Sequence, residues 1–316
     1  MNFILTFHML RSLILQPVFC NYGLILLVVS QSELQLLMKT FIHSITITIV
    51  SVFLFGCPPN HEVPVNGSLV TISKSEHLVM GNPSGAVDSV SYSNNYLMEK
   101  PQYVISYNRD RGIPNWVAWH LDNTWLGNIQ RKDTFRPDST LPSEWYHVKK
   151  SSYNKSGYAR GHHCPSADRT NTIEDNSATF LMTNMMPQAA NNNSGPWEKL
   201  EKYCRILVSQ GEELYIYAGG YGSQGAIDKG HVTIPSHTWK VIMVLDNGEN
   251  DLSRVTSTTR LIAVDMPNSN DQISRSDDWK SYRICVDSIE ARTGFNFYSN
   301  VPALTQEVIE SIADSL

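Results

Sequence analysis

The chain has no excess of positive charge and few charged residues of either sign. Its 316 residues include 25 Lys and Arg against 30 Asp and Glu, a formal net charge of -5, and charged residues make up 17% of the sequence. A protein that binds nucleic acid through a global positive charge is therefore excluded, because counterion release needs cations at the contact surface. With 41% hydrophobic residues, the composition also excludes a disordered polymer and predicts a sizeable core.

Cysteine is scarce, and the common zinc motifs are missing. The chain has five cysteines, and neither a CxxC nor an HExxH spacing occurs, so the sequence gives no support for a zinc site. Cys20 and Cys57 belong to the N-terminal region, which leaves Cys164, Cys204 and Cys285. This odd set allows at most one internal disulfide, and free buried thiols are an equal alternative.

Residues 1–57 have the pattern of a targeting region. A short charged start at Met38 is followed by an apolar run at 41–56, which has signal-peptide length and is short for a membrane span. The run ends at Leu-Phe-Gly-Cys57, which resembles the bacterial lipoprotein cleavage box. We therefore expect an exported protein, with a lipid anchor on Cys57, that is periplasmic, attached to the outer membrane or extracellular.

Two alternatives stay open for this region. An ordinary signal peptide with an incidental cysteine gives the same pattern without a lipid. A second apolar stretch at 10–29 lies upstream and is interrupted by polar residues. Because Met38 opens a complete signal by itself, we expect it to be the true start, with an upstream membrane segment as the competing interpretation. Residues 58–74 would then be a polar tether before a folded domain at 75–316.

Short β-rich segments and a few helices predict one α+β domain from residue 75 onward. Strict alternation of strands and helices is missing, which favours a central, largely antiparallel sheet flanked by helices. We expect a hairpin of strands at 103–107 and 116–121, and further strands at 214–218, 239–245 and 260–264. We expect helices at 193–209, 276–288 and 304–313.

A locally basic segment lies within this acidic chain. Between Arg109 and Arg169 there are ten Lys or Arg and six Asp or Glu, a net charge of +4, although such a run is often only a solvated surface. The segment contains Arg160-Gly161-His162, and an imidazole can act as a general base near neutral pH. In an extended segment Arg160 and His162 share one face, and Gly161 between them leaves room for a large substrate.

A second candidate block is rich in asparagine. It leads through Asn191, Asn192 and Asn193 to Glu201. An asparagine oxygen is a neutral, hard ligand that suits Mg²⁺, although by itself the position of Asn193 at a helix start favours capping over metal binding. Glu201 is eight residues further on, about 12 Å along a helix. This separation fits one direct metal ligand and one carboxylate that acts through a bound water, or else a plain surface glutamate.

Together the two blocks resemble the hallmarks of a known family. Ala159-Arg160-Gly161-His162 is similar to its Asp-Arg-Gly-His motif, and Asn184 to Gln188, Asn193 and 197–201 are similar to its Asn-x-x-Pro-Gln block, metal-binding asparagine and Trp-x-x-Leu-Glu helix. The family is that of the DNA/RNA non-specific endonucleases, or ββα-metal nucleases, which includes the Serratia-type nucleases, endonuclease G and cyanobacterial sugar-non-specific nucleases. Weaker agreement extends from Ser75 to Val301.

The resemblance implies a ββα-metal nuclease fold and a Mg²⁺- or Mn²⁺-dependent hydrolase of phosphodiester bonds. DNA and RNA would be bound through their phosphate backbone, which explains a low sequence preference. His162 would be the general base that activates water, and Asn193 the sole direct protein ligand of the hydrated ion. Glu201 would orient a water of that ion.

The resemblance also implies which arginines contact phosphate. Arg160 and Arg131 would take this role, with Arg136 as a rival of Arg131 because the agreement there is loose. Ala159 stands where the family has Asp, whose loss typically costs about 10-fold to 100-fold in metal affinity or activity. The alternative to an active nuclease is therefore a catalytically weakened nucleic-acid-binding lipoprotein. A zinc hydrolase that uses His162 and His163 is a further rival, but neighbouring residues of a strand point to opposite faces.

Overall fold

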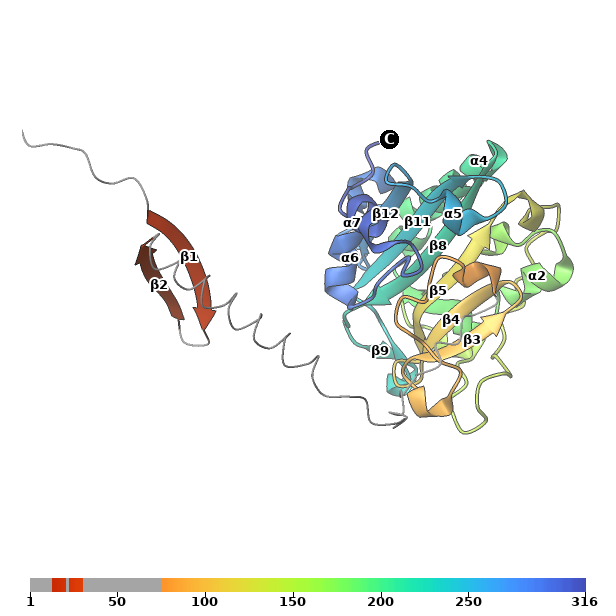
Figure 1. Ribbon diagram of the computed structural model, residues 1–316. Helices are drawn as coiled ribbons and strands as arrows, with labels where there is room; N and C mark the ends of the chain where they lie inside the picture. The colour runs from red at the N-terminus through yellow and green to blue at the C-terminus, as the bar shows by residue number, and fades with distance from the viewer. Residues whose placement is uncertain (1–12, 21–22, 31–74) are drawn as a thin grey trace, which may run out of the picture. The chain divides into compact units, whose positions relative to one another are not determined.

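The computed structural model describes residues 13–20, 23–30 and 75–316, which belong to two separate units (Figure 1). In the first unit, β1 (Leu13–Cys20) and β2 (Gly23–Ser30) form an antiparallel pair, so the described parts of the upstream apolar stretch are strands. Met38, the apolar run at 41–56, Cys57 and the expected tether lie outside the described residues. Among the residues that are described, no helix is long and apolar enough to cross a membrane.

A seven-stranded sheet forms the centre of the second unit (Figure 1). Its strands, in spatial order, are β13 (Arg283–Ile284), β12 (Arg260–Pro267), β11 (His237–Asp246), β8 (Glu212–Tyr221), β5 (Ile113–Leu121), β4 (Tyr103–Asn108) and β3 (Tyr96–Lys100). Every neighbouring pair is antiparallel. The predicted hairpin is β4 with β5, and the other predicted strands lie within β8, β11 and β12. The prediction of a largely antiparallel central sheet is confirmed.

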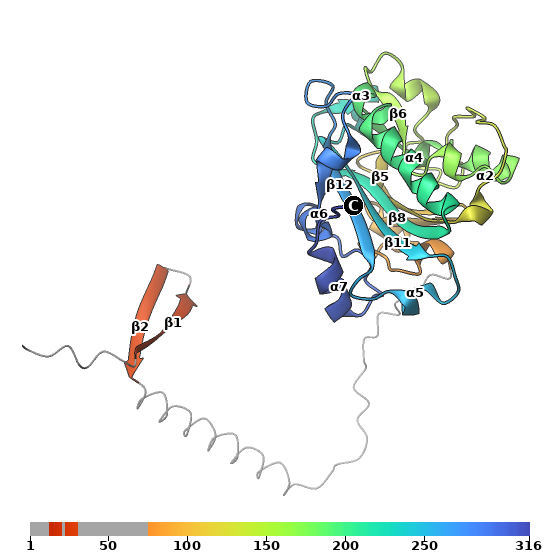
Figure 2. The same ribbon diagram turned by 90° about the horizontal axis from the view of Figure 1, so that it is seen from above.

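Alternate residues of the central strands pack on opposite faces of the sheet, as the period of a strand requires. On β5, Val117 and Trp119 join one hydrophobic core, and Trp116 and Ala118 join the other. Helix α4 (Pro196–Ser209) covers the first core, and α6 (Val286–Thr293) and α7 (Ala303–Glu310) cover the second. Figure 2 shows these helices on opposite sides of the sheet. The domain therefore has three layers.

The core beneath α4 contains two of the three domain cysteines. Cys164 and Cys204 are buried there, and Cys285 is half-buried outside it. All three are free thiols in this structure, which corresponds to the second of the two alternatives, free thiols without a disulfide. Burial raises the pKa of Cys164 and of Cys204 to about 12, which keeps both as inert, protonated apolar side chains.

The expected helix at 276–288 was wrong. A single 3-10 turn at Trp279–Tyr282, capped by the side chain of Asp278, is followed by the short edge strand β13 and only then by α6. The reason is tertiary, because the backbone at Arg283 and Ile284 pairs with β12 and cannot continue a helix. The expected C-terminal helix at 304–313 corresponds to α7.

The expected helix at 193–209 is broken near its start. Helix α3 (Ala190–Asn193) ends before Ser194, and α4 begins at Pro196. Gly195 between them has φ -125° and ψ -118°, which is not helical. Pro196 suits the first turn of α4, because a backbone N–H at that position would have no partner within the helix. Asn193 is thus the last residue of α3 and does not cap α4.

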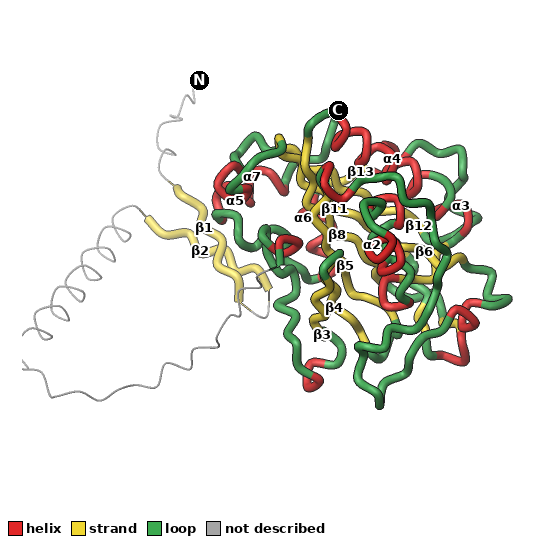
Figure 3. Tube along the Cα trace, turned by 90° about the vertical axis from the view of Figure 1, so that its right-hand side faces the viewer, coloured by secondary structure: helices red, strands yellow, loops and turns green. Residues whose placement is uncertain are grey.

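A second, two-stranded sheet precedes these helices. Strands β6 (Ala159–His162) and β7 (Met185–Gln188) are antiparallel, with Ala159 opposite Gln188 and His162 opposite Met185. Followed by α3 and α4, they form a ββα unit on the α4 side of the central sheet (Figure 2). Loops and short elements complete the domain (Figure 3). These elements are α2 (Ile173–Ala178), α5 (Asp251–Arg254), β9 (Ala226–Ile227) and β10 (Val232–Thr233).

The contact between α6 and α7 predicts a pH-dependent stability. Glu310 is buried, and its carboxyl oxygens lie within 4.8 Å of those of Asp287 and Glu290. Burial raises the pKa of Glu310 from 4.5 to about 8, and the charge of Glu290 acts in the same direction. The folded state therefore retains a proton that the unfolded chain has lost, and the free energy of unfolding falls as pH rises from about 5 to 8.

We expect Glu310→Gln to remove most of this decline, on the order of 2 kcal/mol, in urea unfolding at pH 5 and pH 8. Glu307→Gln, at an exposed position of the same helix, is the control and should keep the wild-type decline. An unchanged decline in Glu310→Gln would contradict the assignment.

Candidate active site

One pocket of about 330 Å³ is lined by residues of the ββα unit and by Arg131, which lies in the loop that precedes β6 in the sequence. All five residues that the sequence singled out line this pocket, although they come from separate parts of the chain. They are Arg131, Arg160, His162, Asn193 and Glu201. The structure therefore brings the two motif blocks together at one place.

Strand β6 presents two of these side chains on one face. Arg160 and His162 both line the pocket, whereas His163 is fully buried and its Nδ1 lies 3.0 Å from the backbone oxygen of Asn184. The expectation that His163 points to the opposite face is confirmed. A zinc site shared by His162 and His163 is excluded by this geometry.

The expected purpose of Gly161 was wrong. A Cβ atom at this position would lie 2.2 Å from Oε1 of Gln188 and 2.6 Å from its Cβ, so the space above the glycine is filled by a side chain of β7 and not by substrate. Gln188 is itself buried and donates a hydrogen bond of 2.9 Å from its Nε2 to Oδ1 of Asn192. Gly161 thus permits the close pairing of β6 with β7.

His162 has the surroundings of a neutral base. Its ring packs against Phe180, with centroids 5.1 Å apart and nearly perpendicular planes, and against Phe135 at 5.6 Å. Burial lowers the pKa of His162 to about 3, and the charges of Arg131 and Arg160 act in the same direction. Its buried Nε2 has no hydrogen-bond partner in the structure. At neutral pH the imidazole is uncharged and can accept a proton.

Arg131 and Arg160 pack against the two aromatic rings that also contact His162. The guanidinium of Arg131 lies 4.9 Å from the ring centre of Phe180, and that of Arg160 lies 4.7 Å from the ring centre of Phe135. Arg131 also donates to Oγ of Ser166 at 3.1 Å and forms an exposed ion pair of 2.9 Å with Asp133. The buried Nε of Arg160 has no hydrogen-bond partner. An unsatisfied buried donor is costly, so this corner of the pocket favours an anion.

The structure also separates Arg131 from its rival. Nη1 of Arg136 donates to the backbone oxygen of Ser177 at 2.7 Å, and Arg136 does not line the pocket. Its guanidinium therefore secures the loop to the end of α2. Arg131 is the arginine of this loop that is placed to meet a ligand.

Three consecutive asparagines have different tasks. The amide of Asn191 donates to backbone oxygens of Asn270 and Ile273, and that of Asn192 donates to Thr238 and Pro267. Asn193 faces the pocket, and within residues 75–316 no side-chain hydrogen bond involves its amide. The first two asparagines fix the position of α3, and the third keeps its oxygen available for a ligand.

Helix α4 supplies a further residue that the sequence analysis missed. Arg205 lines the pocket one turn after Glu201, and its Nη1 is 2.7 Å from Oδ1 of the buried Asp168. The signal was present, because residues four apart share a helix face. The 12 Å separation expected between Asn193 and Glu201 does not apply, since the chain is not one continuous helix between them.

Ala159 leaves this pocket without a carboxylate from β6. The residue is half-buried at the start of the strand, its backbone pairs with Gln188, and it does not line the pocket. Its methyl group can neither hold water nor orient Arg160. The carboxylates that do line the pocket, Glu198 and Glu201, come from α4.

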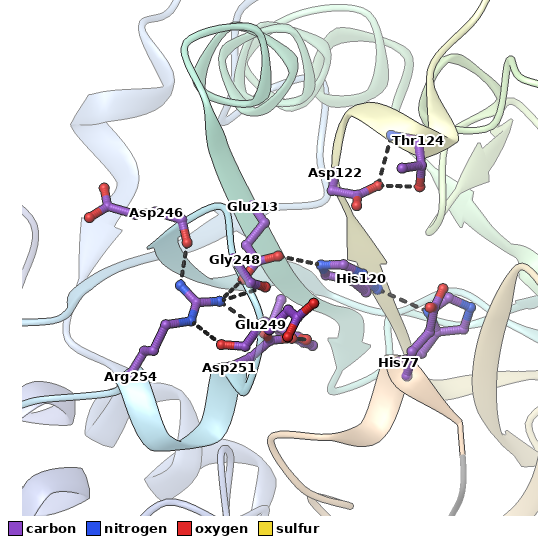
Figure 4. A network of polar contacts seen from close by, with 12 residues as sticks. His77, His120, Asp122, Thr124, Glu213, Asp246, Gly248, Glu249, Asp251 and Arg254 are labelled. Carbon is purple, nitrogen blue, oxygen red and sulfur yellow. Dashed lines mark hydrogen bonds and ion pairs between the residues drawn. The ribbon is translucent and has the colours of Figure 1, made fainter.

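A second group of possible metal ligands is already neutralised. His120, Glu213 and Asp251 place their ligand atoms within 4.8 Å of one another. Arg254 forms ion pairs with both Glu213 and Asp251, the latter at 2.9 Å, and Nε2 of His120 lies 3.3 Å from Glu213 (Figure 4). The guanidinium occupies the position that a cation would need. Within this network the protein supplies its own positive charge.

A ββα unit that brings a neutral histidine, two arginines and a free asparagine amide into one pocket defines the class of ββα-metal nucleases. The model of the DNA/RNA non-specific endonuclease family matches residues 81–304, and the chain belongs to this family. The expected family and fold are confirmed.

Similar proteins agree with this assignment. A nuclease of Nostoc sp. (strain PCC 7120) is 52% identical over 261 residues, which are 82% of this chain and 94% of that protein. The mitochondrial nuclease EXOG of Danio rerio is 29% identical, over 75% of this chain and 68% of that protein. Among solved structures, the EndoG/EndoGI complex contains a chain with a TM-score of 0.60 at 22% identity, covering 72% of this chain and 92% of that chain, which shows the shared fold.

The break between α3 and α4 generates a prediction at Gly195. A Cβ there would lie 2.3 Å from the backbone oxygen of Asn191 and 2.7 Å from Cα of Arg275, and backbone atoms cannot move aside cheaply. We expect Gly195→Ala to lower the free energy of unfolding by about 1–3 kcal/mol in urea titrations. Gly248→Ala, where a Cβ would meet only the Arg254 side chain at 3.5 Å or more, is the control. Equal stability of the two variants would refute the prediction.

Proposed function

We propose that this protein is an exported endonuclease that hydrolyses phosphodiester bonds of DNA and RNA with little sequence preference. In this proposal His162 is the general base and Asn193 holds a Mg²⁺ or Mn²⁺ ion. Membership in the family supports the reaction class. The observation that carries the residue roles is the shared pocket, in which the unpartnered Nε2 of His162 and the free amide of Asn193 meet two arginines.

His162 is suited to deprotonate a water molecule. Its buried Nε2 has no hydrogen-bond partner, and burial together with the neighbouring arginines lowers the pKa, so that the imidazole is uncharged in the resting protein. The rings of Phe135 and Phe180 hold the imidazole in a fixed orientation. A fixed, neutral imidazole that faces the scissile phosphate is the arrangement that general-base catalysis requires.

The pocket fits a hydrated divalent cation. Asn193 offers one neutral oxygen, and Glu201 and Glu198 add carboxylates on the adjoining helix, which suits an ion that keeps most of its waters. When bound, such an ion supplies positive charge to the phosphate and to the departing oxygen. Asn191 and Asn192 hold the backbone of α3 in place, so Asn193 is preorganised as a ligand.

The cationic side chains of the pocket are suited to hold phosphate. Arg131 and Arg160 pack against aromatic rings. Arg131 donates to Asp133 from Nε and to Ser166 from Nη1, which leaves its Nη2 for a ligand, and Nε of Arg160 has no partner. Arg205 adds a third guanidinium from α4. Contacts of this kind address the sugar-phosphate backbone and carry no base information, which supports cleavage of DNA and RNA alike.

Export and a lipid anchor are part of the proposal and rest on the sequence. The apolar run at 41–56 and the box that ends at Cys57 support secretion with lipidation of Cys57. The protein would then act in the periplasm, at the outer membrane or outside the cell. The alternative function, a nucleic-acid-binding lipoprotein with weakened catalysis, is favoured by one observation, the absence of a β6 carboxylate at Ala159.

The purified protein should degrade plasmid DNA and RNA in the presence of Mg²⁺ or Mn²⁺, and EDTA should stop both reactions. We expect His162→Ala to lower the cleavage rate by about 10²-fold to 10⁴-fold without loss of DNA binding, because only the base is removed. Asn193→Ala should weaken Mn²⁺ binding in the absence of nucleic acid. Substrate that stays intact under every metal condition would reject the nuclease, and DNA binding retained there would favour the alternative function.

The variant Ala159→Asp tests whether the alanine at this position lowers the rate of cleavage. If a carboxylate at this position assists the neighbouring arginine or the waters of the ion, the variant should cleave DNA about 10-fold to 100-fold faster. Ala226→Asp places the same charge on an exposed residue of β9 and should leave the rate unchanged. A rate for Ala159→Asp at or below that of the wild type would show that alanine is no handicap.

A further inference from the structure

Lys240 is a buried lysine for which the reaction has no assigned use. It lies in the middle of β11, opposite Ala218 of β8 and Val264 of β12, and its side chain is 1% exposed. Its neighbours Trp239 and Val241 belong to the core beneath α6 and α7, so Lys240 points to the α4 side. An ammonium group in such a position is costly unless a specific partner compensates for the lost hydration.

The partner is a residue of the candidate active site. Nζ of Lys240 lies 3.6 Å from Oε1 of Glu201, which lines the pocket and is 13% exposed. Two indole rings enclose the ammonium, with ring centres 4.3 Å away for Trp197 and 5.4 Å away for Trp119. Within residues 75–316, Glu201 is the one acid in ion-pair distance of Lys240.

Other charges near Glu201 are already paired. Arg205 is bound to Asp168 at 2.7 Å, and the same carboxylate accepts a hydrogen bond of 3.1 Å from Nε1 of Trp119. Lys202 is bound to Glu198 at 2.8 Å, at the exposed part of the pocket. Lys240 is therefore the cation that approaches Glu201 from beneath the pocket, held on the rigid sheet.

We propose that Lys240 is a positioning residue, which holds the carboxylate of Glu201 in place so that the pocket binds its divalent ion. This inference rests on the proposed function of Asn193 and Glu201. A sheet residue enclosed by two tryptophans has little freedom, so its charge fixes the Glu201 side chain more firmly than a surface lysine could. Without Lys240, the carboxylate would be free to turn toward solvent, and the ion would lose part of its support.

The test is Mn²⁺ binding measured by electron paramagnetic resonance in the absence of nucleic acid. We expect Lys240→Met, which keeps the volume and removes the charge, to raise the Kd for Mn²⁺ about 10-fold or more while the fold is retained. Lys240→Arg, which keeps the charge, should recover part of this loss. Glu201→Gln should weaken binding in the wild type and add little in the Lys240→Met background, as coupled residues do.

A matched control removes an ion pair of similar burial elsewhere. Lys100 is 11% exposed and lies 2.9 Å from the buried Asp138, and neither residue lines the pocket. Lys100→Met should destabilise the fold and leave the Kd for Mn²⁺ unchanged. If Lys240→Met binds Mn²⁺ as tightly as the wild type, or if Lys100→Met weakens binding equally, the positioning role is refuted.

Two further observations keep the test decisive. If Lys240→Met does not fold, the inference can be tested on the wild type through its lysine ¹⁵N resonances. The Lys240 ammonium signal should shift on Mg²⁺ saturation, and the same signal should stay unmoved in Asn193→Ala. A signal that ignores Mg²⁺ overturns the inference. If the wild type binds no Mn²⁺ at all, the proposed function fails together with it. If binding depends on Asn193 but not on Lys240, the inference alone fails.

Discussion

The pairing of β6 with β7 is the interaction on which the site depends. These two short strands carry the histidine motif and lead directly into α3, so their register decides how far His162 lies from Asn193. Buried amides then secure the pair against the large sheet, since Asn268 receives a hydrogen bond from Ala189 and donates to Pro187. A pocket assembled from distant parts of the chain stays in register because backbone and amide hydrogen bonds join these elements at its base.

The electrostatics of the pocket depend on which groups pack against each charged side chain. Aromatic rings pack against Arg131 and Arg160. Arg131 also forms an exposed ion pair of 2.9 Å with Asp133, whereas within residues 75–316 no carboxylate is paired with Arg160. On the opposite wall the charges are paired, with Asp168 behind Arg205 and Lys240 behind Glu201. The pocket thus has one side open to an anion and one side built to hold a cation.

Much of the architecture could be predicted from residue patterns, because strands such as β8 and β11 combine β-branched and aromatic residues with polar ends. Elements set by tertiary contacts could not, and the edge strand β13 is the example. The site motifs named the right neighbourhood, yet only the fold shows that Asn191 and Asn192 are structural while Asn193 is free. Arg205 and Lys240 belong to no recognisable sequence motif. Their importance depends on contacts with residues that are distant in the sequence, Asp168 for Arg205 and Glu201 for Lys240.

The contact between Gly161 and Gln188 has a consequence for how such a sequence can change. A side chain at position 161 would collide with a glutamine that also holds Asn192, so position 161 cannot gain a side chain unless Gln188 changes as well. The two motifs, which look independent in the linear sequence, are therefore joined by one packing contact. A variant with a side chain at position 161 would therefore need a compensating change at Gln188, so a substitution in the first motif depends on the residue in the second.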